Sequence, residues 1–347
     1  MGAKEGRRIK YISFINAVAA VAVLTLHTNG CFWSFSATEL YWKIANVIEG
    51  VFYFAVPLFF MVSGITLMDF YERDTISSYF LKRFRKVFIP FIAWSIIGLI
   101  EKVCIHAIDI HDITPKYIYE GIVGTKIVKI YWFFTSLFIL YLSMPLIAAV
   151  DKKRRKEVFS YAVIIGFILN QAVPFIKNLF SLDITTPYVV IAVSGVLLWP
   201  PLGWLLHNCE LSRKQKVLIY SISVLGLLIH ITGTYYLSMK AGHVVKVFKG
   251  YQNVPSVFYS VGVFVFLKDI GNKIMEGKAA TFINWFSKYT FPIYLMQFIL
   301  LDRLPRLPFV DTHSVIYILG APFVIIPIII LITWCMRKVP GLKVILP

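Results

Sequence analysis

Charged residues are scarce in this chain, and cysteines are scarcer. Asp, Glu, Lys and Arg make up 15% of the 347 residues, against about 25% in ordinary soluble domains. The four cysteines, Cys31, Cys104, Cys209 and Cys335, lie far apart and form no C-x-x-C pair. They indicate no metal site, although a single disulfide between Cys31 and Cys104 stays open. Low-complexity tracts and internal repeats are also lacking, so the sequence does not suggest the paired halves common in secondary transporters.

Apolar residues are abundant instead. They account for 58% of the chain, and the mean hydropathy is +0.74. Most of them fall in runs of about 20 residues, the length that crosses the hydrocarbon core of a bilayer. The predicted spans are roughly 11–31, 48–70, 87–106, 130–150, 158–176, 187–206, 217–238, 254–269, 282–301 and 314–336.

A segment that crosses lipid must satisfy its own backbone hydrogen bonds, so these spans are expected to be helices. The sequence therefore predicts an all-α, polytopic integral membrane protein with about ten transmembrane helices. We expect residues 1–347 to form one membrane-embedded domain with no appended soluble domain. The expected location is the cell (plasma) membrane, with the lipid bilayer as the first partner.

The formal net charge of +17 could suggest a nucleic-acid partner. We expect none, because the basic residues lie between apolar runs and no soluble basic domain is left over. Of the 35 Lys and Arg residues, 23 fall in alternate connections, 11 in the opposite ones, and Lys288 within a predicted span. Since cytoplasmic loops carry such an excess, the bias predicts that both termini are cytoplasmic. The richer connections are 1–10, 71–86, 151–157, 207–216, 268–280 and 337–347.

Two ionisable residues fall at similar depth near the outer face. His27 lies about 16 residues into the first span, or about 24 Å from its inner end. An imidazole can act as a general base near neutral pH. Glu49 begins the second span, and a neighbouring carboxylate could orient that imidazole. His27 and Glu49 are therefore the catalytic candidates, against the alternatives of a helix-end histidine touching headgroups and a solvated loop acid.

A basic cluster lies where the third span leaves the cytoplasmic side. Arg83, Arg85 and Lys86 belong to the stretch FLKRFRKVFIPFIAW. Arginine pairs with phosphate in a bidentate way, so this cluster suits a phosphorylated cofactor that arrives from the cytosol. The alternative is simple anchoring by positive charge. In the second span, Ser63 and Gly64 are small enough to let helices approach closely, and no G-x-S-x-G motif surrounds Ser63.

Five segments taken in order resemble the acyltransferase 3 family of membrane acyltransferases, which includes bacterial O-acetyltransferases of surface polysaccharides. The likeness covers essentially the whole chain. It rests on YISFINAVAAVAVLTLHTNG with its late His27, VFYFAVPLFFMVSGITLM, YFLKRFRKVFIPF, KIYWFFTSLFILYLSMPLI with Trp132, and FSKYTFPIYLMQ with Tyr294.

Two positions depart from the family pattern. Members usually carry an arginine eleven residues before the histidine, where this chain has Asn16, and a late histidine where it has Gln297. An asparagine can hydrogen-bond but supplies no fixed charge. Asn16, Ser63, Trp132, Tyr294 and Gln297 are expected to face the substrate or its channel.

The resemblance implies a reaction. An acyl group, most often acetyl, would come from cytosolic acetyl-CoA or another acyl-CoA. It would pass through the protein to a hydroxyl of a cell-envelope polysaccharide or lipid-linked sugar. The resemblance also implies envelope-biosynthesis proteins as further partners. His27 would be the base or acyl carrier, and Arg83 and Arg85 would contact the CoA phosphates. The alternatives are a non-catalytic transporter or polysaccharide-export component of the same fold, and a sensor or assembly subunit that has lost catalysis.

Overall fold

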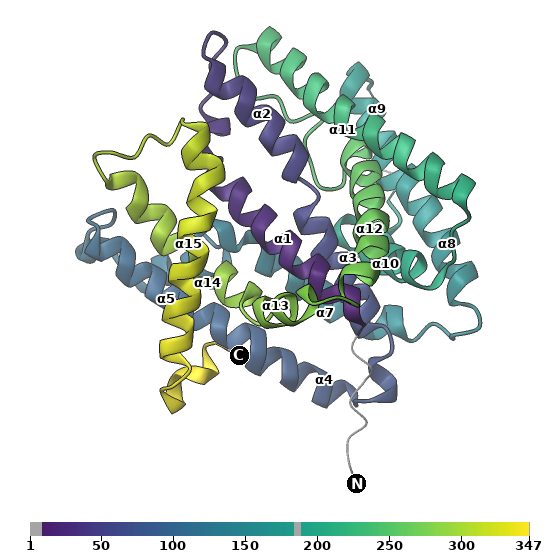
Figure 1. Cartoon of the computed structure of the whole chain (residues 1–347), viewed down its shortest axis with the longest axis horizontal. Coiled ribbons are helices and arrows are strands. Elements are labelled where there is room, and N and C mark those ends of the chain that lie inside the picture. The colour runs from purple at the N-terminus through teal and green to yellow at the C-terminus, as the bar shows by residue number, and fades with distance from the viewer. Residues whose placement is uncertain (1–8, 184–188, 347) are drawn as a thin grey trace.

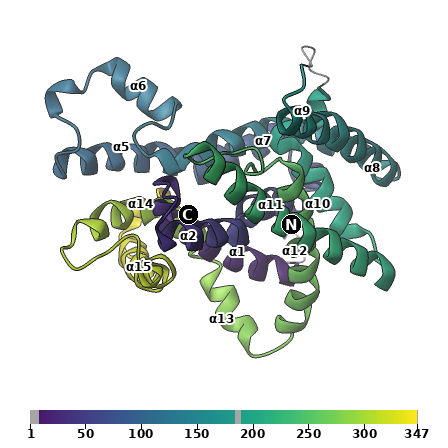
Figure 2. The same ribbon diagram turned by 90° about the horizontal axis from the view of Figure 1, so that it is seen from above.

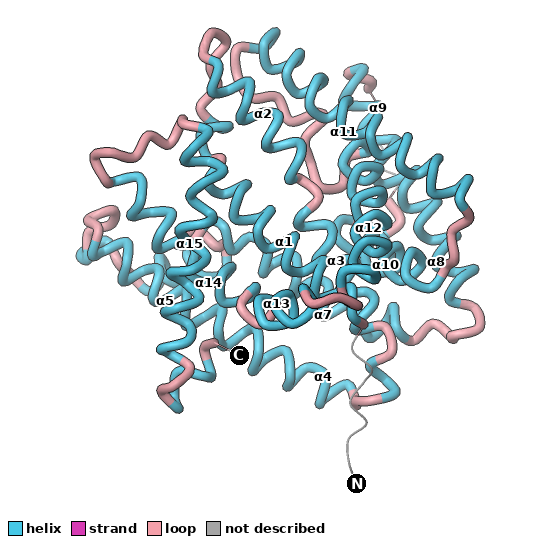
Figure 3. The backbone as a smooth tube through the Cα atoms, viewed as in Figure 1, coloured by secondary structure: helices cyan, strands magenta, loops and turns pink. Residues whose placement is uncertain are grey.

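The computed structural model describes residues 9–183 and 189–346, and this part of the chain contains helices, turns and loops but no strand (Figures 1 and 3). The predicted all-α class is confirmed. The α-helices are α1 (Lys10–Thr28), α2 (Leu40–Phe52), α3 (Ala55–Leu67), α4 (Ile76–Arg83), α5 (Ile89–Cys104), α6 (Pro115–Val123), α7 (Trp132–Ala148), α8 (Arg155–Gly166), α9 (Val173–Phe180), α10 (Trp199–Asn208), α11 (Arg213–Ala241), α12 (Val254–Ile274), α13 (Ala279–Phe286), α14 (Thr290–Arg303) and α15 (Val315–Met336).

Among the described residues, 8 helical segments are long and apolar enough to cross a bilayer. The polytopic membrane class is therefore confirmed. Each of these segments overlaps one of the ten predicted spans. They are Lys10–Thr28, Leu40–Glu72, Ile76–Cys104, Lys129–Ala148, Arg155–Phe180, Arg213–Ala241, Val254–Ile274 and Val315–Met336.

The predicted span 187–206 is not one continuous helix. Its first two residues lie outside the described part of the chain, and from residue 189 onward it forms two short 3₁₀ turns before α10 begins at Trp199. The side chain of Asn170 holds the turns in place, donating to the carbonyl oxygens of Val190 and Val193 at 3.0 and 3.2 Å and accepting from the Val190 N–H at 2.9 Å. A side chain thus supplies hydrogen bonds that a helix would otherwise have to make.

The predicted span 282–301 is also divided. α13 ends at Phe286 and α14 begins at Thr290. Pro292 explains the break, because a proline ring clashes with the carbonyl four residues earlier and is tolerated only in a first turn. The 14 residues of α14 extend about 21 Å at 1.5 Å per residue, which is short of the about 30 Å hydrocarbon core. The site residues on α14 therefore belong to a helix shorter than a full span.

The backbones of α3 and α10 lie very close to each other. A Cβ atom added to Gly64 would lie 2.2 Å from the carbonyl oxygen of Pro200, and one added to Gly203 would lie 2.4 Å from that of Met61. Only glycine permits this approach, so the prediction that small residues at 63–64 serve helix packing is confirmed at Gly64. α3 is separated from α2 at Tyr53 and Phe54, where the ring of Pro57 would meet the Tyr53 carbonyl of a continuous helix.

α1 runs through the middle of the molecule and contacts α3, α12, α14 and α15 (Figure 1). α4, α13 and the end of α15 lie in the lower part of that view, so the basic connections 71–86 and 268–280 share one side of the molecule. Seen from above, α6 lies beyond α5 at one edge and α13 lies at the opposite edge (Figure 2). That the basic side is cytoplasmic stays a prediction of the charge bias.

Candidate active site

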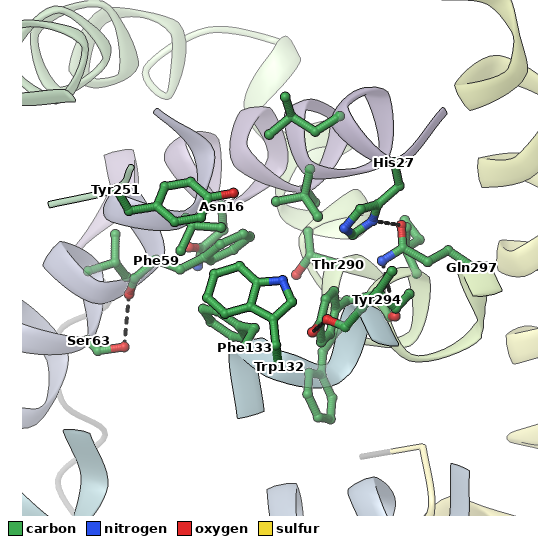
Figure 4. Close-up of a pocket in the computed structure, with 18 residues that line it drawn as sticks. Asn16, His27, Phe59, Ser63, Trp132, Phe133, Tyr251, Thr290, Tyr294 and Gln297 are labelled. Atoms are coloured by element: carbon green, nitrogen blue, oxygen red, sulfur yellow. Dashed lines mark hydrogen bonds between the residues drawn. The ribbon is translucent and has the colours of Figure 1, made fainter. Parts of the chain in front are cut away.

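A cavity of about 240 Å³ lies between α1, α3, α7, α14 and the connection 242–253 (Figure 4). Most of its lining is apolar or aromatic, including Phe59, Phe133 and Phe291. Six of the residues singled out from the sequence line it together, although they come from four different helices. They are Asn16, His27, Ser63, Trp132, Tyr294 and Gln297.

His27 lies in the last turn of α1 and is half-buried. Its Nδ1 atom lies 3.2 Å from Oε1 of Gln297, whose Nε2 donates to the Tyr294 carbonyl at 3.2 Å. Because an amide oxygen only accepts, the hydrogen of the neutral imidazole must be on Nδ1. Nε2 then keeps its lone pair, and it points away from Gln297 toward the cavity (Figure 4). The hydrogen bond to Gln297 therefore directs the unprotonated Nε2 of His27 at the cavity.

α14 is fixed to the start of α7 by two tyrosine hydroxyls. Tyr294 donates to the Ile130 carbonyl at 2.5 Å, and Tyr131 donates to the Leu295 carbonyl at 2.6 Å. Ile130 and Tyr131 lie in the 3₁₀ turn Lys129–Tyr131 directly before α7, far from α14 in the sequence. The two hydrogen bonds determine the depth of α14, and therefore the position of Gln297 relative to His27.

The other end of the cavity holds Asn16 and Ser63. Asn16 lies eleven residues before His27, or about 16 Å along the helix axis. Its buried Oδ1 atom has no hydrogen-bond partner among the described residues, so it is available to a bound molecule. The Ser63 hydroxyl donates to the Phe59 carbonyl at 2.9 Å, a bond within its own helix. This bonding fits a structural serine that also forms part of the cavity wall.

The hydrogen bonds of Glu49 differ from those predicted for it. Its carboxylate is buried, pairs with the ammonium of Lys249 and accepts from Asn29 Nδ2 at 3.1 Å. The residue bonded to the His27 imidazole is Gln297, and Glu49 is not among the residues that line the cavity. Direct orientation of the imidazole by Glu49 is therefore not what the structure shows.

The basic cluster of the third span lies at a second hollow, an open cleft of about 690 Å³. Arg83 and Lys86 line it, whereas Arg85 is exposed and is not among the lining residues. A π-helical turn, Phe84–Phe88, separates α4 from α5 at this point. The Arg83 guanidinium is 4.1 Å from the Tyr79 ring centroid and 5.9 Å from that of Tyr141. The three predicted cations thus divide between the cleft and the open surface.

The cavity and the cleft meet α3 about one turn apart. Ser63 lines the cavity, and Thr66 lines the cleft. Three residues correspond to about 4.5 Å of rise. A molecule bound in the cleft would therefore have its nearest part close to the Ser63 end of the cavity.

Sequence reasoning missed Lys249 and Tyr251. Both lie in the connection 242–253, which reads as an ordinary loop. Yet Lys249 is 6% exposed, and Tyr251 lines the cavity. The available signal was two lysines, Lys246 and Lys249, in a connection assigned to the side poor in basic residues. Such a weak signal could not show that the loop folds inward.

The fold and the cavity define a multi-pass membrane protein with a histidine in the wall of a cavity between its helices. The sequence model of the acyltransferase 3 family, described as an acyltransferase domain, matches residues 9–337. The chain therefore belongs to that family and is a membrane acyltransferase, which confirms the resemblance drawn from the five motifs. No curated protein and no solved structure matches the chain.

Proposed function

We propose that this protein transfers an acetyl group from cytosolic acetyl-CoA to a hydroxyl of a cell-envelope polysaccharide or lipid-linked sugar. The observation that carries the proposal is the hydrogen bond between His27 Nδ1 and Gln297 Oε1 at the cavity wall. It leaves Nε2 free to accept a proton inside a mainly apolar enclosure. A hydroxyl needs such a base to attack a thioester.

The transfer balances with His27 as base and then acid. Nε2 takes the proton of the acceptor hydroxyl while the hydroxyl oxygen bonds to the thioester carbonyl carbon. The carbon–sulfur bond then breaks, and the sulfur leaves as a thiolate that takes the proton back from the imidazolium. Gln297 accepts from Nδ1–H throughout and so supports the charged ring. An amide does this less strongly than a carboxylate would, because it carries no charge.

The cleft at Arg83 and Lys86 suits the phosphate-bearing part of the donor. Guanidinium and ammonium groups both bind phosphate, the former in a bidentate way. Two acidic residues, Glu72 and Asp74, also line the cleft, against four basic ones, Arg73, Lys82, Arg83 and Lys86. Positive charge is therefore in excess there, and the thioester end of the donor would extend past α3 toward His27.

His27→Ala tests the proposal. Loss of a general base slows a reaction by about 10²–10⁴-fold, so we expect the acetyl content of extracted envelope glycans, measured by mass spectrometry, to fall to the level of a deletion strain. His111→Ala is the matched control, because His111 is exposed and lies outside the cavity lining. Normal acetylation in His27→Ala, with the protein present in the membrane, would refute the proposal.

A further inference from the structure

The connection 242–253 folds inward and carries a buried lysine, Lys249, that the proposed reaction does not use. Lys249 is 6% exposed and Glu49, its partner on α2, is 5% exposed. Both charges are removed from water, so each is stabilised mainly by the opposite charge of its partner. Taking away one partner of such a pair leaves an uncompensated buried charge, which is strongly destabilising. The ion pair is therefore a stiff link between α2 and this connection.

From that ion pair a column of stacked groups reaches the cavity. The Lys249 ammonium is 4.1 Å from the Tyr53 ring centroid. Tyr251 stacks on Tyr53 with centroids 4.3 Å apart and planes at 7°, so the ammonium lies over the opposite face of Tyr53. Tyr251 also stacks on Trp132 at 5.4 Å and 18°. Tyr251 and Trp132 both line the cavity, and the column ends in its wall.

The column is also tied to the helix that carries the base. Asn29 follows His27 by two residues, and its Nδ2 donates to the Ala45 carbonyl at 2.9 Å and to Glu49 at 3.1 Å. Glu49 thus joins three elements: the end of α1, α2 and the connection 242–253. A shift of the ion pair would move the wall of the cavity relative to His27.

We infer that Glu49 and Lys249 are positioning residues that hold Tyr251 against Trp132, and that this aromatic wall restricts the enzyme to short acyl chains. The size limit rests on the proposed acyl transfer. A cavity of about 150 Å³ accommodates benzene, and this one measures about 240 Å³. It has room for an acetyl thioester and the attacking hydroxyl, and widening it on the Tyr251 side would admit longer chains.

Hydrogen exchange of residues 242–253 in the purified protein tests the positioning. Glu49→Gln and Lys249→Met each leave one buried group without its partner, so we expect at least tenfold faster exchange in this segment. The double variant removes both charges and should recover part of the protection. Lys126→Met is the matched control, since it breaks an exposed ion pair with Glu120 and should leave the segment unchanged. Unchanged exchange in both single variants would overturn the positioning role.

Acyl-chain selection tests the wall. Membranes are supplied with labelled acetyl-, butyryl- and hexanoyl-CoA, and label in the envelope glycan is counted. Tyr251→Ala should raise the hexanoyl-to-acetyl ratio at least tenfold, Glu49→Gln should raise it in the same direction, and Tyr251→Phe should keep the wild-type ratio. An unchanged ratio in Tyr251→Ala would overturn size selection. Failure of the wild type to use any acyl-CoA would instead refute the proposed function, while the exchange experiment would still decide the positioning role.

Discussion

The cavity at His27 and the cleft at Arg83 show how one helix serves two different environments. The cavity is the smaller, at about 240 Å³, and its lining is mostly aromatic and aliphatic. The cleft is an open hollow of about 690 Å³ lined by acidic and basic residues. α3 contributes to both, and in the proposed transfer each would face a different part of the reaction.

That difference has a physical reason. A base aimed at a developing charge works best where little water screens it, since electrostatic interactions grow as the effective dielectric falls. Capture of a phosphate needs fixed positive charges, and these are cheapest to keep at a wetted surface. In the proposed transfer, separating the two environments by about one helical turn would let the protein meet both requirements.

The largest expected effect comes from disrupting the packing of α3, the helix that lines both the cavity and the cleft, against α10. Gly64→Ala places a methyl group 2.2 Å from the Pro200 carbonyl oxygen, and backbone on both sides cannot give way. The cost should exceed the about 1–3 kcal/mol typical of overpacking. We expect little monodisperse protein by size-exclusion chromatography in detergent.

Gly320→Ala is the control for that experiment, because a Cβ atom there meets nothing within 4 Å. Its yield and melting temperature should equal or exceed those of the wild type, since alanine favours the helix. Equal yield and melting temperature in Gly64→Ala and Gly320→Ala would mean that α3 and α10 do not pack closely at Gly64.

A smaller effect is expected on the cavity side alone. Gln297→Leu removes the acceptor for the His27 Nδ1–H, and a buried donor without a partner costs about 1–3 kcal/mol. We expect kcat to fall roughly tenfold to hundredfold, with KM for acyl-CoA near the wild-type value, in a thiol-release assay. Gln297→His restores an acceptor and should recover much of the rate. A fully active Gln297→Leu variant would contradict the assignment of Gln297.

The smallest effect is expected on the cleft side. Arg83→Ala should raise KM for acyl-CoA about tenfold without lowering kcat, and the difference should shrink as salt screens the cleft. Arg85 is exposed and lies outside the cleft lining, so Arg85→Ala should change KM less than about threefold. A larger rise in KM for Arg85→Ala than for Arg83→Ala would show that the donor binds on the other side of the π-helical turn.

The sequence was sufficient for the class of fold and for much of the cavity. Hydropathy located the 8 long segments found among the described residues, because length and apolar character are all that a span requires. It could not show where a span breaks. The division between α13 and α14 depends on Pro292, and the irregular path before α10 depends on the side chain of Asn170, which is distant in sequence.

Contacts between residues far apart in the sequence also could not be predicted. His27 and Gln297 were both identified, but their hydrogen bond joins positions 270 residues apart. Glu49 was matched to His27 by depth alone, whereas its actual partner, Lys249, lies in a connection that has no span-like pattern. Depth along a helix follows from counting residues, but the direction in which a side chain points does not.

The most direct test of the account uses membrane vesicles of known orientation from cells that make the acceptor glycan. Labelled acetyl-CoA is supplied to one face only, and label in the glycan is measured for the wild type and for His27→Ala. We predict incorporation only when acetyl-CoA meets the face that bears the Arg83 cleft, and none in the variant. Incorporation from the opposite face, or equal incorporation in His27→Ala, would contradict transfer through the cavity.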